Sequence, residues 1–96
     1  MKINIQKLEG TEFQRKVWGA ISKIPKGKTV TYKELANKIG RPLAVRAVGN
    51  SVGTNPFPVV IPCHRVLRSD GSLGGYSGRG GAKTKRMLLI KEGVYF

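Results

Sequence analysis

The only cysteine and the only histidine of the chain stand side by side, within the segment IPCHRV at residues 61–66. An adjacent imidazole can hold a thiol in its nucleophilic thiolate form, and the guanidinium of Arg65 adds positive charge beside the pair. A single cysteine has no disulfide partner within the chain and no further cysteines for a Cys-rich metal site. Cys63 is therefore either a buried structural residue or a nucleophile, and the neighbouring His64 favours the nucleophile.

The charge of the chain indicates a polyanionic partner. Its 96 residues carry 18 Lys and Arg against 5 Asp and Glu, a formal charge of +13, and nucleic acid is the default partner for such a surface. Binding to a membrane surface would require an amphipathic helix with segregated basic residues, whereas here they are scattered. A ribosomal role stays open on charge alone. Because no apolar run could span a bilayer and no signal sequence opens the chain, we expect one small cytoplasmic domain, where a free thiol persists.

Three helices are predicted in the first half of the chain, where they must support the Cys-His segment. A capping box, TEFQ, begins a helix over residues 11–24, and a second capping box, TYKE, begins a helix over residues 31–39. A third helix restarts at residues 41–42, with Pro42 in its first turn, and continues through Val48. The second and third helices, joined by a tight turn that contains glycine, form a helix-turn-helix.

The third predicted helix has an unusual surface, because Arg46 is the one long cation among small side chains. On a helix that faces DNA, small residues let the backbone approach the duplex, and an arginine can reach between the strands or onto a phosphate. The same pattern suits a packing face between helices, and the net charge favours DNA. The small residues are Ala44, Ala47, Gly49 and Ser51.

Shorter segments flank these helices. Residues 1–8 alternate apolar and polar side chains, which suits a short strand or an extended lead-in. Two prolines in the segment 55–58 stiffen the approach to the Cys-His pair, and the apolar run 59–61 is expected in the core. The sequence RSDG at 68–71 is typical of a turn.

The last quarter of the chain combines a glycine-dense loop with a helix. Residues 74–81 suit a flexible linker or a phosphate cradle, but they lack the Gly-Lys-Ser/Thr ending of a nucleotide-binding loop. A final helix over residues 82–91, with Gly93 beyond its end, is expected to present Met87 and Ile90 to the interior.

From Phe13 to Gly93, the chain resembles the active-site domain of the O6-alkylguanine-DNA alkyltransferases, since several separate motifs agree in order and spacing. The most specific is PCHRV at residues 62–66. The others are RAVG at 46–49, NP at 55–56, YSG at 76–78, LL at 88–89 and EG at 92–93.

The resemblance implies a mainly α fold with short strands, namely a winged-helix-like, helix-turn-helix DNA-binding domain. It implies that residues 1–96 form a single active-site and DNA-binding domain, and that the N-terminal ribonuclease H-like domain of most relatives is absent. The loop at 78–81 is longer than the usual Gly-Gly, which affects the expected pocket size. No metal and no cofactor are expected.

The implied reaction is DNA repair by a single-turnover protein. A flipped O6-alkylguanine enters a pocket, and the thiolate attacks the alkyl carbon to leave a thioether and restored guanine. A histidine relay withdraws the thiol proton through a water, an asparagine fixes the geometry, and a tyrosine hydroxyl protonates the leaving base. The catalytic residues implied are Cys63, His64, Glu92, Asn55 and Tyr32.

The resemblance also implies contacts to the base and to double-stranded DNA. Arg46 takes the place of the flipped base, and the small-residue helix lies in the minor groove, unlike most such helices. For the base, the implied residues are Tyr76 as a wall, Ser77 as a hydrogen-bond donor, the carbonyl of Val66, and Lys85 in support of the glycine loop. For DNA, they are Arg46, Thr31, Ala44, Ala47 and Gly49.

Two other classes of function stay open beside a monomeric alkyltransferase. Short relatives exist that bind alkylated guanine without transfer, but they replace the cysteine, so the retained Cys63 favours transfer. A plain helix-turn-helix regulator would prefer a sequence and ignore alkylation, and the chain offers no evident dimer interface for a palindromic site.

Overall fold

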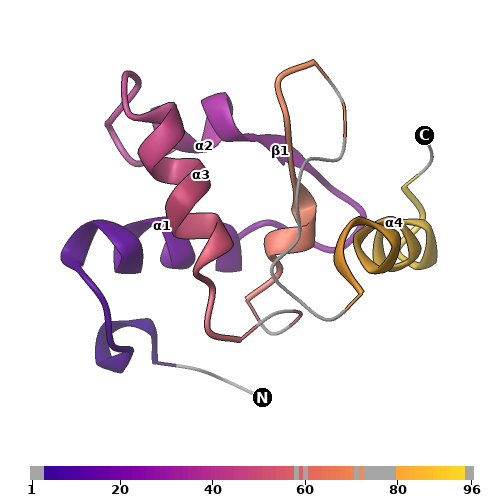
Figure 1. Cartoon of the computed structure of the whole chain (residues 1–96), viewed down its shortest axis with the longest axis horizontal. Helices are drawn as coiled ribbons and strands as arrows, with labels where there is room; N and C mark the ends of the chain where they lie inside the picture. The colour runs from indigo at the N-terminus through magenta and orange to yellow at the C-terminus, as the bar shows by residue number, and fades with distance from the viewer. Residues whose placement is uncertain (1–3, 58, 60, 71, 73–79, 95–96) are drawn as a thin grey trace.

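The computed structural model describes residues 4–57, 59, 61–70, 72 and 80–94 (Figure 1). In these ranges four helices and two short strands surround the segment that carries the Cys-His pair, as expected for a mainly α fold with short strands. In chain order the elements are η1 (Ile5–Lys7), α1 (Glu12–Ser22), β1 (Val30–Thr31), α2 (Tyr32–Lys38), α3 (Val45–Gly53), η2 (Cys63–Arg65), β2 (Val66–Leu67) and α4 (Gly81–Lys91).

Both predicted capping boxes are confirmed. At the start of α1 the Thr11 hydroxyl accepts a hydrogen bond from the Gln14 amide at 3.0 Å, and the Gln14 side chain accepts one from the Thr11 amide at 2.8 Å. At the start of α2, Thr31 and Glu34 repeat the exchange at 3.0 and 2.8 Å. Each box satisfies two amides that the first helical turn leaves unpaired, so the two helices have defined starting points.

The third helix begins later than predicted. α3 starts at Val45, and Pro42 lies in the turn before it rather than in the first helical turn. The physical reason is local, because a residue before proline is disfavoured in the helical region, so Arg41 stays in the turn. The Arg41 amide donates to the Ala36 carbonyl at 2.9 Å and its carbonyl accepts from the Ala44 amide at 2.9 Å. The turn is closed at both ends, and α2 and α3 pack together as a helix-turn-helix.

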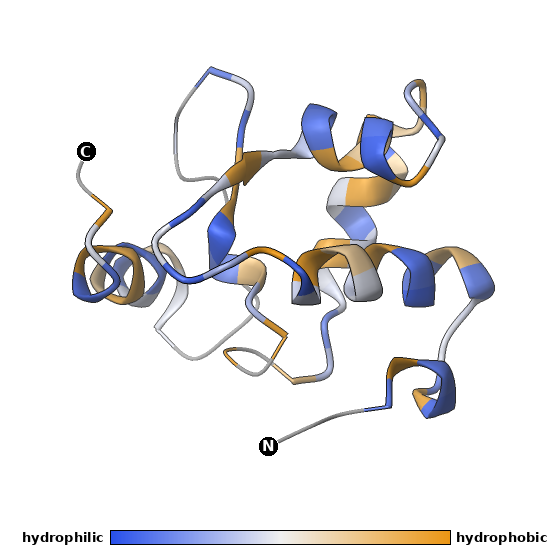
Figure 2. Cartoon of the chain, turned by 180° about the vertical axis from the view of Figure 1, so that it is seen from behind, coloured by the Kyte–Doolittle hydropathy of each residue, from blue (hydrophilic) through white to orange (hydrophobic). Residues whose placement is uncertain are grey.

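The core lies between the first three helices and the Cys-His segment. Trp18 ties α1 to α3, since its indole nitrogen donates to the buried Ser51 carbonyl at 2.8 Å. In Figure 2 the hydrophobic colours gather on the facing sides of these elements. The buried apolar residues that form this cluster are Val17, Trp18, Ile21, Ile24, Leu35, Ala36, Val48, Val52, Ile61, Cys63 and Val66.

A two-stranded parallel ladder connects the helix-turn-helix to the Cys-His segment. Val30 is paired with Val66, and Thr31 with Leu67. Because β1 runs directly into α2 and η2 runs directly into β2, this pairing places the start of α2 beside Cys63.

Two expectations about the flanking segments were wrong, and a third, the turn after Arg68, was confirmed. Residues 5–7 form a 3-10 turn capped by the Asn4 side chain, not a strand, because no neighbouring strand pairs with them among the described residues. Val59 is 53% exposed with φ +76°, whereas Ile61 of the same run is buried as predicted. The turn predicted at 68–71 is present at Ser69-Asp70 and is closed by the Arg68 amide donating to the Ser72 carbonyl at 3.0 Å.

The final helix is confirmed, but the face expected to be buried is not. Met87 and Ile90 are 62% and 48% exposed, and the buried side chains of α4 are Lys85 and Leu89. These two are four positions apart and share the stripe that packs toward η2. A buried lysine is rare, so the hydrophobic pattern alone selects the wrong stripe. Every helix of the described ranges is too short or too polar to cross a membrane.

Candidate active site

The Cys-His pair sits on the short turn η2, with both side chains withdrawn from solvent. Cys63 is 2% exposed and His64 is 1% exposed. The Cys63 amide donates to the Ile61 carbonyl at 2.7 Å, and the Arg65 amide donates to the Pro62 carbonyl at 3.0 Å. These backbone bonds fix the turn, so the thiol has a defined position at the edge of the core.

Asn55 holds the segment that leads into this turn. Its side-chain amide donates to the Ile61 carbonyl at 2.7 Å, and its side-chain oxygen accepts from the Phe57 amide at 2.9 Å. The side chain is buried, so both bonds are shielded from water. The structure thus places Asn55 where it positions the backbone of the Cys63 turn.

Glu92, at the end of α4, binds the imidazole of His64. The distance between His64 Nε2 and Glu92 Oε2 is 3.0 Å. Because an ionised carboxylate only accepts hydrogen bonds, we assign the imidazole proton to Nε2, which leaves Nδ1 as an acceptor. Nδ1 is buried, and no group of the described residues hydrogen-bonds it. Burial lowers the pKa of His64 against the opposing effect of Glu92, so the ring is a neutral base at pH 7.

Arg65 fixes Glu92, a contact that the sequence reasoning missed. Its Nε and Nη2 donate to the two carboxylate oxygens at 2.9 and 2.7 Å, and its Nη1 donates to the Ile24 carbonyl at 2.8 Å. These hydrogen bonds are the main cause that lowers the pKa of Glu92 to about 2. Arg65 and Glu92 are 27 positions apart, so the sequence gives no local signal of their contact and indicates only a positive charge beside the Cys-His pair.

Lys85 and Tyr32 form a second group of titratable side chains near Cys63. Lys85 is fully buried, and its ammonium donates to the Val66 carbonyl at 2.6 Å and lies 6.0 Å from the centre of the Tyr32 ring. Burial lowers the pKa of Lys85 to about 8, and Cys63 acts in the opposite direction. Burial and then Cys63 raise the pKa of Tyr32. Both groups are therefore close enough to Cys63 to interact with it electrostatically.

The residues expected to contact DNA divide between two sides of α3. Arg46 and Ala47 are exposed, and Ala44 is half-buried at the start of the helix. Gly49 is half-buried and faces Tyr32, since a Cβ built on it would lie 4.0 Å from the ring. Ser51 is buried against Trp18, so the packing interpretation holds for one side of α3 and the other side is open to solvent.

The remaining expected site residues are Thr31, Tyr76 and Ser77. The Thr31 hydroxyl and amide are both engaged in the capping box of α2. Tyr76 and Ser77 lie outside the described residues. Among the residues that the structure does describe, no group of three or more His, Cys, Asp and Glu side chains could hold a metal ion.

The arrangement holds the types of group that deprotonation of a thiol requires, on η2 and on the end of α4 packed against it. It contains a buried thiol, a neutral imidazole whose Nδ1 accepts no hydrogen bond from the described part of the chain, and a carboxylate that is kept ionised by an arginine. The carboxylate and arginine orient the imidazole, as the third group of a nucleophile-base-orienter set does.

Comparison with known proteins agrees with this chemistry. The chain is 53% identical over 84 residues to the methylated-DNA--protein-cysteine methyltransferase of Methanosarcina barkeri, covering 88% of this chain and 52% of the relative. It is 51% identical over 85 residues to the bifunctional transcriptional activator/DNA repair enzyme Ada of Escherichia coli, covering 88% of this chain and 23% of Ada. The chain thus spans about a quarter to a half of the length of these curated relatives.

Solved structures with the same fold include proteins bound to DNA. The OGT of Mycobacterium tuberculosis in complex with DNA has a TM-score of 0.85 and 49% identity, covering 90% of this chain and 52% of that one. S. pombe Atl1, in complex with damaged DNA containing O6-carboxymethylguanine, has a TM-score of 0.77 and 35% identity, covering 92% and 82%. The family model for the DNA binding domain of 6-O-methylguanine DNA methyltransferase matches residues 12–94, and the chain belongs to this family.

Proposed function

We propose that this protein repairs double-stranded DNA by moving the alkyl group of O6-alkylguanine onto Cys63, once per molecule. The observation that carries the proposal is the chain of contacts from Arg65 through Glu92 to the buried imidazole of His64, the residue next to Cys63. Membership of the family supports the substrate class. The proposal extends to a monomer that acts in the cytoplasm, with residues 1–96 as one active-site and DNA-binding domain.

In the proposed reaction, Cys63 loses its proton to Nδ1 of His64 through a water molecule. The thiolate sulfur attacks the alkyl carbon, a sulfur–carbon bond forms, and the bond from that carbon to O6 of guanine breaks. The electron pair of the broken bond stays on the guanine, which takes a proton from the Tyr32 hydroxyl. The phenol of Tyr32 is protonated at neutral pH, since its pKa lies above the ordinary 10.0, and the guanine anion is the base that takes this proton. The Tyr32 proton is then replaced from water, and the thioether remains on Cys63.

The base pocket is proposed to lie between Cys63, Tyr32 and Lys85. The Val66 carbonyl is held in place by Lys85 and has a second lone pair for the exocyclic amine of guanine. Tyr76 as a wall and Ser77 as a donor to O6 complete the proposed pocket. The depth of Cys63 fits this role, since a base must leave the duplex to reach a thiol that is 2% exposed.

For DNA binding, we assign the exposed side of α3 to the minor groove. Arg46 is exposed and is proposed to fill the gap left by the flipped base, while Ala44 and Ala47 allow the helix backbone to approach the duplex. Gly49 and Thr31 complete the proposed surface. The formal charge of +13 supplies affinity that does not depend on sequence and falls with salt.

The proposal is tested by mass spectrometry after incubation with a duplex that carries one O6-methylguanine. We expect one methyl group on the peptide that contains Cys63, at no more than one equivalent per protein, and none on a Cys63→Ala control. The proposal would be refuted if the protein stays unmethylated and the O6-methylguanine remains in the duplex. It would also be refuted if the Cys63→Ala protein repairs the duplex as well as the wild type does.

A second candidate is a lesion-binding sensor without transfer. The observation that favours it is the likeness to Atl1, which was solved with damaged DNA and is matched over 82% of its length. A sensor would bind the methylated duplex more tightly than an unmethylated duplex of the same sequence and leave Cys63 unmodified. The same incubation, followed by a gel-shift titration with both duplexes, separates the two functions.

A further inference from the structure

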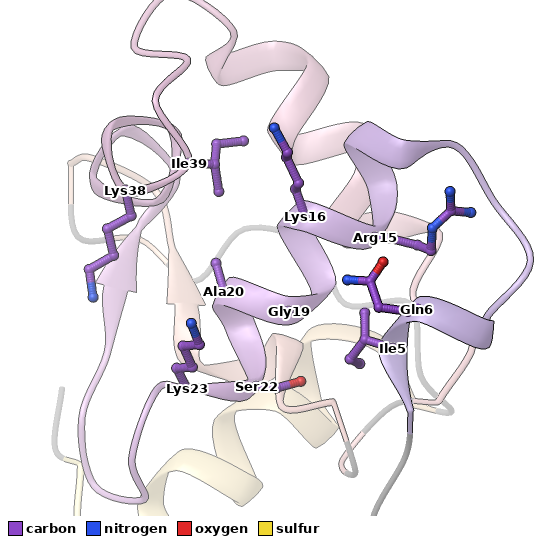
Figure 3. A pocket seen from close by; sticks show the side chains of 10 residues that line it. All are labelled: Ile5, Gln6, Arg15, Lys16, Gly19, Ala20, Ser22, Lys23, Lys38 and Ile39. Atoms are coloured by element: carbon purple, nitrogen blue, oxygen red, sulfur yellow. The ribbon is translucent and has the colours of Figure 1, made fainter.

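A groove lies on the face of α1 that points away from α3, remote from the proposed active site. It has a volume of about 820 Å³ and is formed by η1, α1 and the end of α2. Figure 3 shows the side chains of α1 on one side, Lys38 of α2 and the following Ile39 on another, and Ile5 and Gln6 of η1 on a third.

The position of the groove follows from the periodicity of α1. Trp18 points toward α3, where it bonds the Ser51 carbonyl. Ala20 is two positions further along, which turns its side chain by about 200° and places it on the opposite face. Ala20 lines the groove together with Lys16, Gly19 and Lys23, at the spacing of one helical stripe. Figure 1 looks onto α3 and Figure 2 is seen from behind, where α1 is nearest the viewer.

The groove joins an apolar floor to a cationic rim. Its floor holds Ile5, Gly19, Ala20 and Ile39, and a Cβ built on Gly19 would meet only Ile5, at 4.0 Å. The rim carries four cations, and none of the described residues that line the groove has a carboxylate. The rim residues are Arg15, Lys16, Lys23 and Lys38.

We propose that this groove binds an acidic amphipathic helix of a partner protein. A helix of this kind lays apolar side chains into a groove and presents carboxylates to a basic rim. The phosphates of DNA could pair with the four cations, but they offer no apolar group to cover the isoleucine, alanine and glycine of the floor. Since α3 faces the other way, the partner can bind whether or not α3 holds DNA, so the inference does not depend on the proposed function.

The test is a binding titration with a labelled 15-residue peptide that has Leu at helical spacing and Glu between, followed by fluorescence anisotropy. A second peptide with Gln in place of Glu isolates the contribution of charge. Lys16→Glu combined with Lys38→Glu should weaken binding about tenfold or more, which corresponds to ~1.4 kcal/mol. Lys26→Glu combined with Lys83→Glu changes the net charge equally at exposed positions outside the groove and should have little effect.

A third variant tests the apolar floor without changing charge. Gly19→Leu fills the floor, favours the helix and should abolish peptide binding. Circular dichroism checks that this variant is folded. The proposal is overturned if both charge variants weaken binding equally, if the Gln peptide binds as well as the Glu peptide, or if Gly19→Leu binds normally. It is also overturned if the Lys16/Lys38 variant loses affinity for unmodified duplex DNA as strongly as for the peptide, because the groove would then be a nucleic-acid surface.

Discussion

Glu92→Gln is the substitution that best tests the relay, because it keeps the shape of the side chain and removes its charge. Glu92 accepts two hydrogen bonds from Arg65 and one from His64. In the variant the arginine faces a neutral amide, and the amide has no defined preference for the Nε2 tautomer of the imidazole. We expect lower stability and slower methyl transfer.

The expected loss of stability follows from the pKa of Glu92, which is lowered from its ordinary 4.5 to about 2, first by the hydrogen bonds from Arg65. Each pKa unit corresponds to about 1.4 kcal/mol, so the ionised carboxyl contributes at most about 3.4 kcal/mol. The side chain lies near the surface, at 12% exposed, and solvent screens part of this attraction. We therefore expect Glu92→Gln to lower the free energy of unfolding by about 2 kcal/mol at pH 7.

The sign of the pH dependence is fixed by the direction of the pKa change. A carboxyl whose pKa is lowered by folding stabilises the protein above about pH 4.5, and this contribution disappears as the pH falls toward 2. The difference between wild type and Glu92→Gln should thus shrink between pH 5 and pH 3.

Urea unfolding, followed through the fluorescence of Trp18, measures this difference. Trp18 is the only tryptophan and is 2% exposed, so its emission reports loss of the core. Glu9→Gln removes the same charge at an exposed position and serves as the control. A loss below about 0.5 kcal/mol at pH 7, or a loss of the same size at pH 7 and pH 3, would contradict the reasoning.

Three further predictions use the same protein. Gly80→Ala should cost about 1–3 kcal/mol in urea unfolding, because Gly80 has φ +89° and a Cβ there overlaps Thr84, whereas Gly53→Ala, with open space around it, should be nearly neutral. The stability of the wild type should rise from pH 8 to pH 10, because folding lowers the pKa of Lys85 to about 8 and unfolding then takes up a proton; the rise should be absent in Lys85→Met. Arg46→Ala should leave the urea midpoint unchanged, since Arg46 is exposed. The substitution should lower the rate of repair of a methylated duplex much more than the rate of repair of the free O6-methylguanine base, which needs no flipping.

Much of the helical framework was predictable, because its signals are local. Thr11 with Gln14 and Thr31 with Glu34 have the spacing that caps a helix, and the structure confirms both boxes. The start of α3 was misplaced because proline is acceptable in a first helical turn as well as in the turn before it. The buried stripe of α4 was misplaced because Lys85 looks like a surface residue until its carbonyl partner is known.

The site shows the same division. The sequence by itself determined the reactive element, since Cys63 and His64 are adjacent and no packing is needed to bring them together. It also determined the family, through motifs whose order and spacing are properties of the chain.

Only the tertiary structure decided what surrounds the thiol. The carboxylate of Glu92 reaches His64 and Arg65 because α4 packs against η2, and Lys85 reaches the Val66 carbonyl for the same reason. The parallel pairing of β1 with β2 brings Tyr32, at the start of α2, close enough to Cys63 to interact with it electrostatically. These contacts join residues about 20 to 40 positions apart, and such pairings depend on the burial and packing of the whole domain rather than on any local preference.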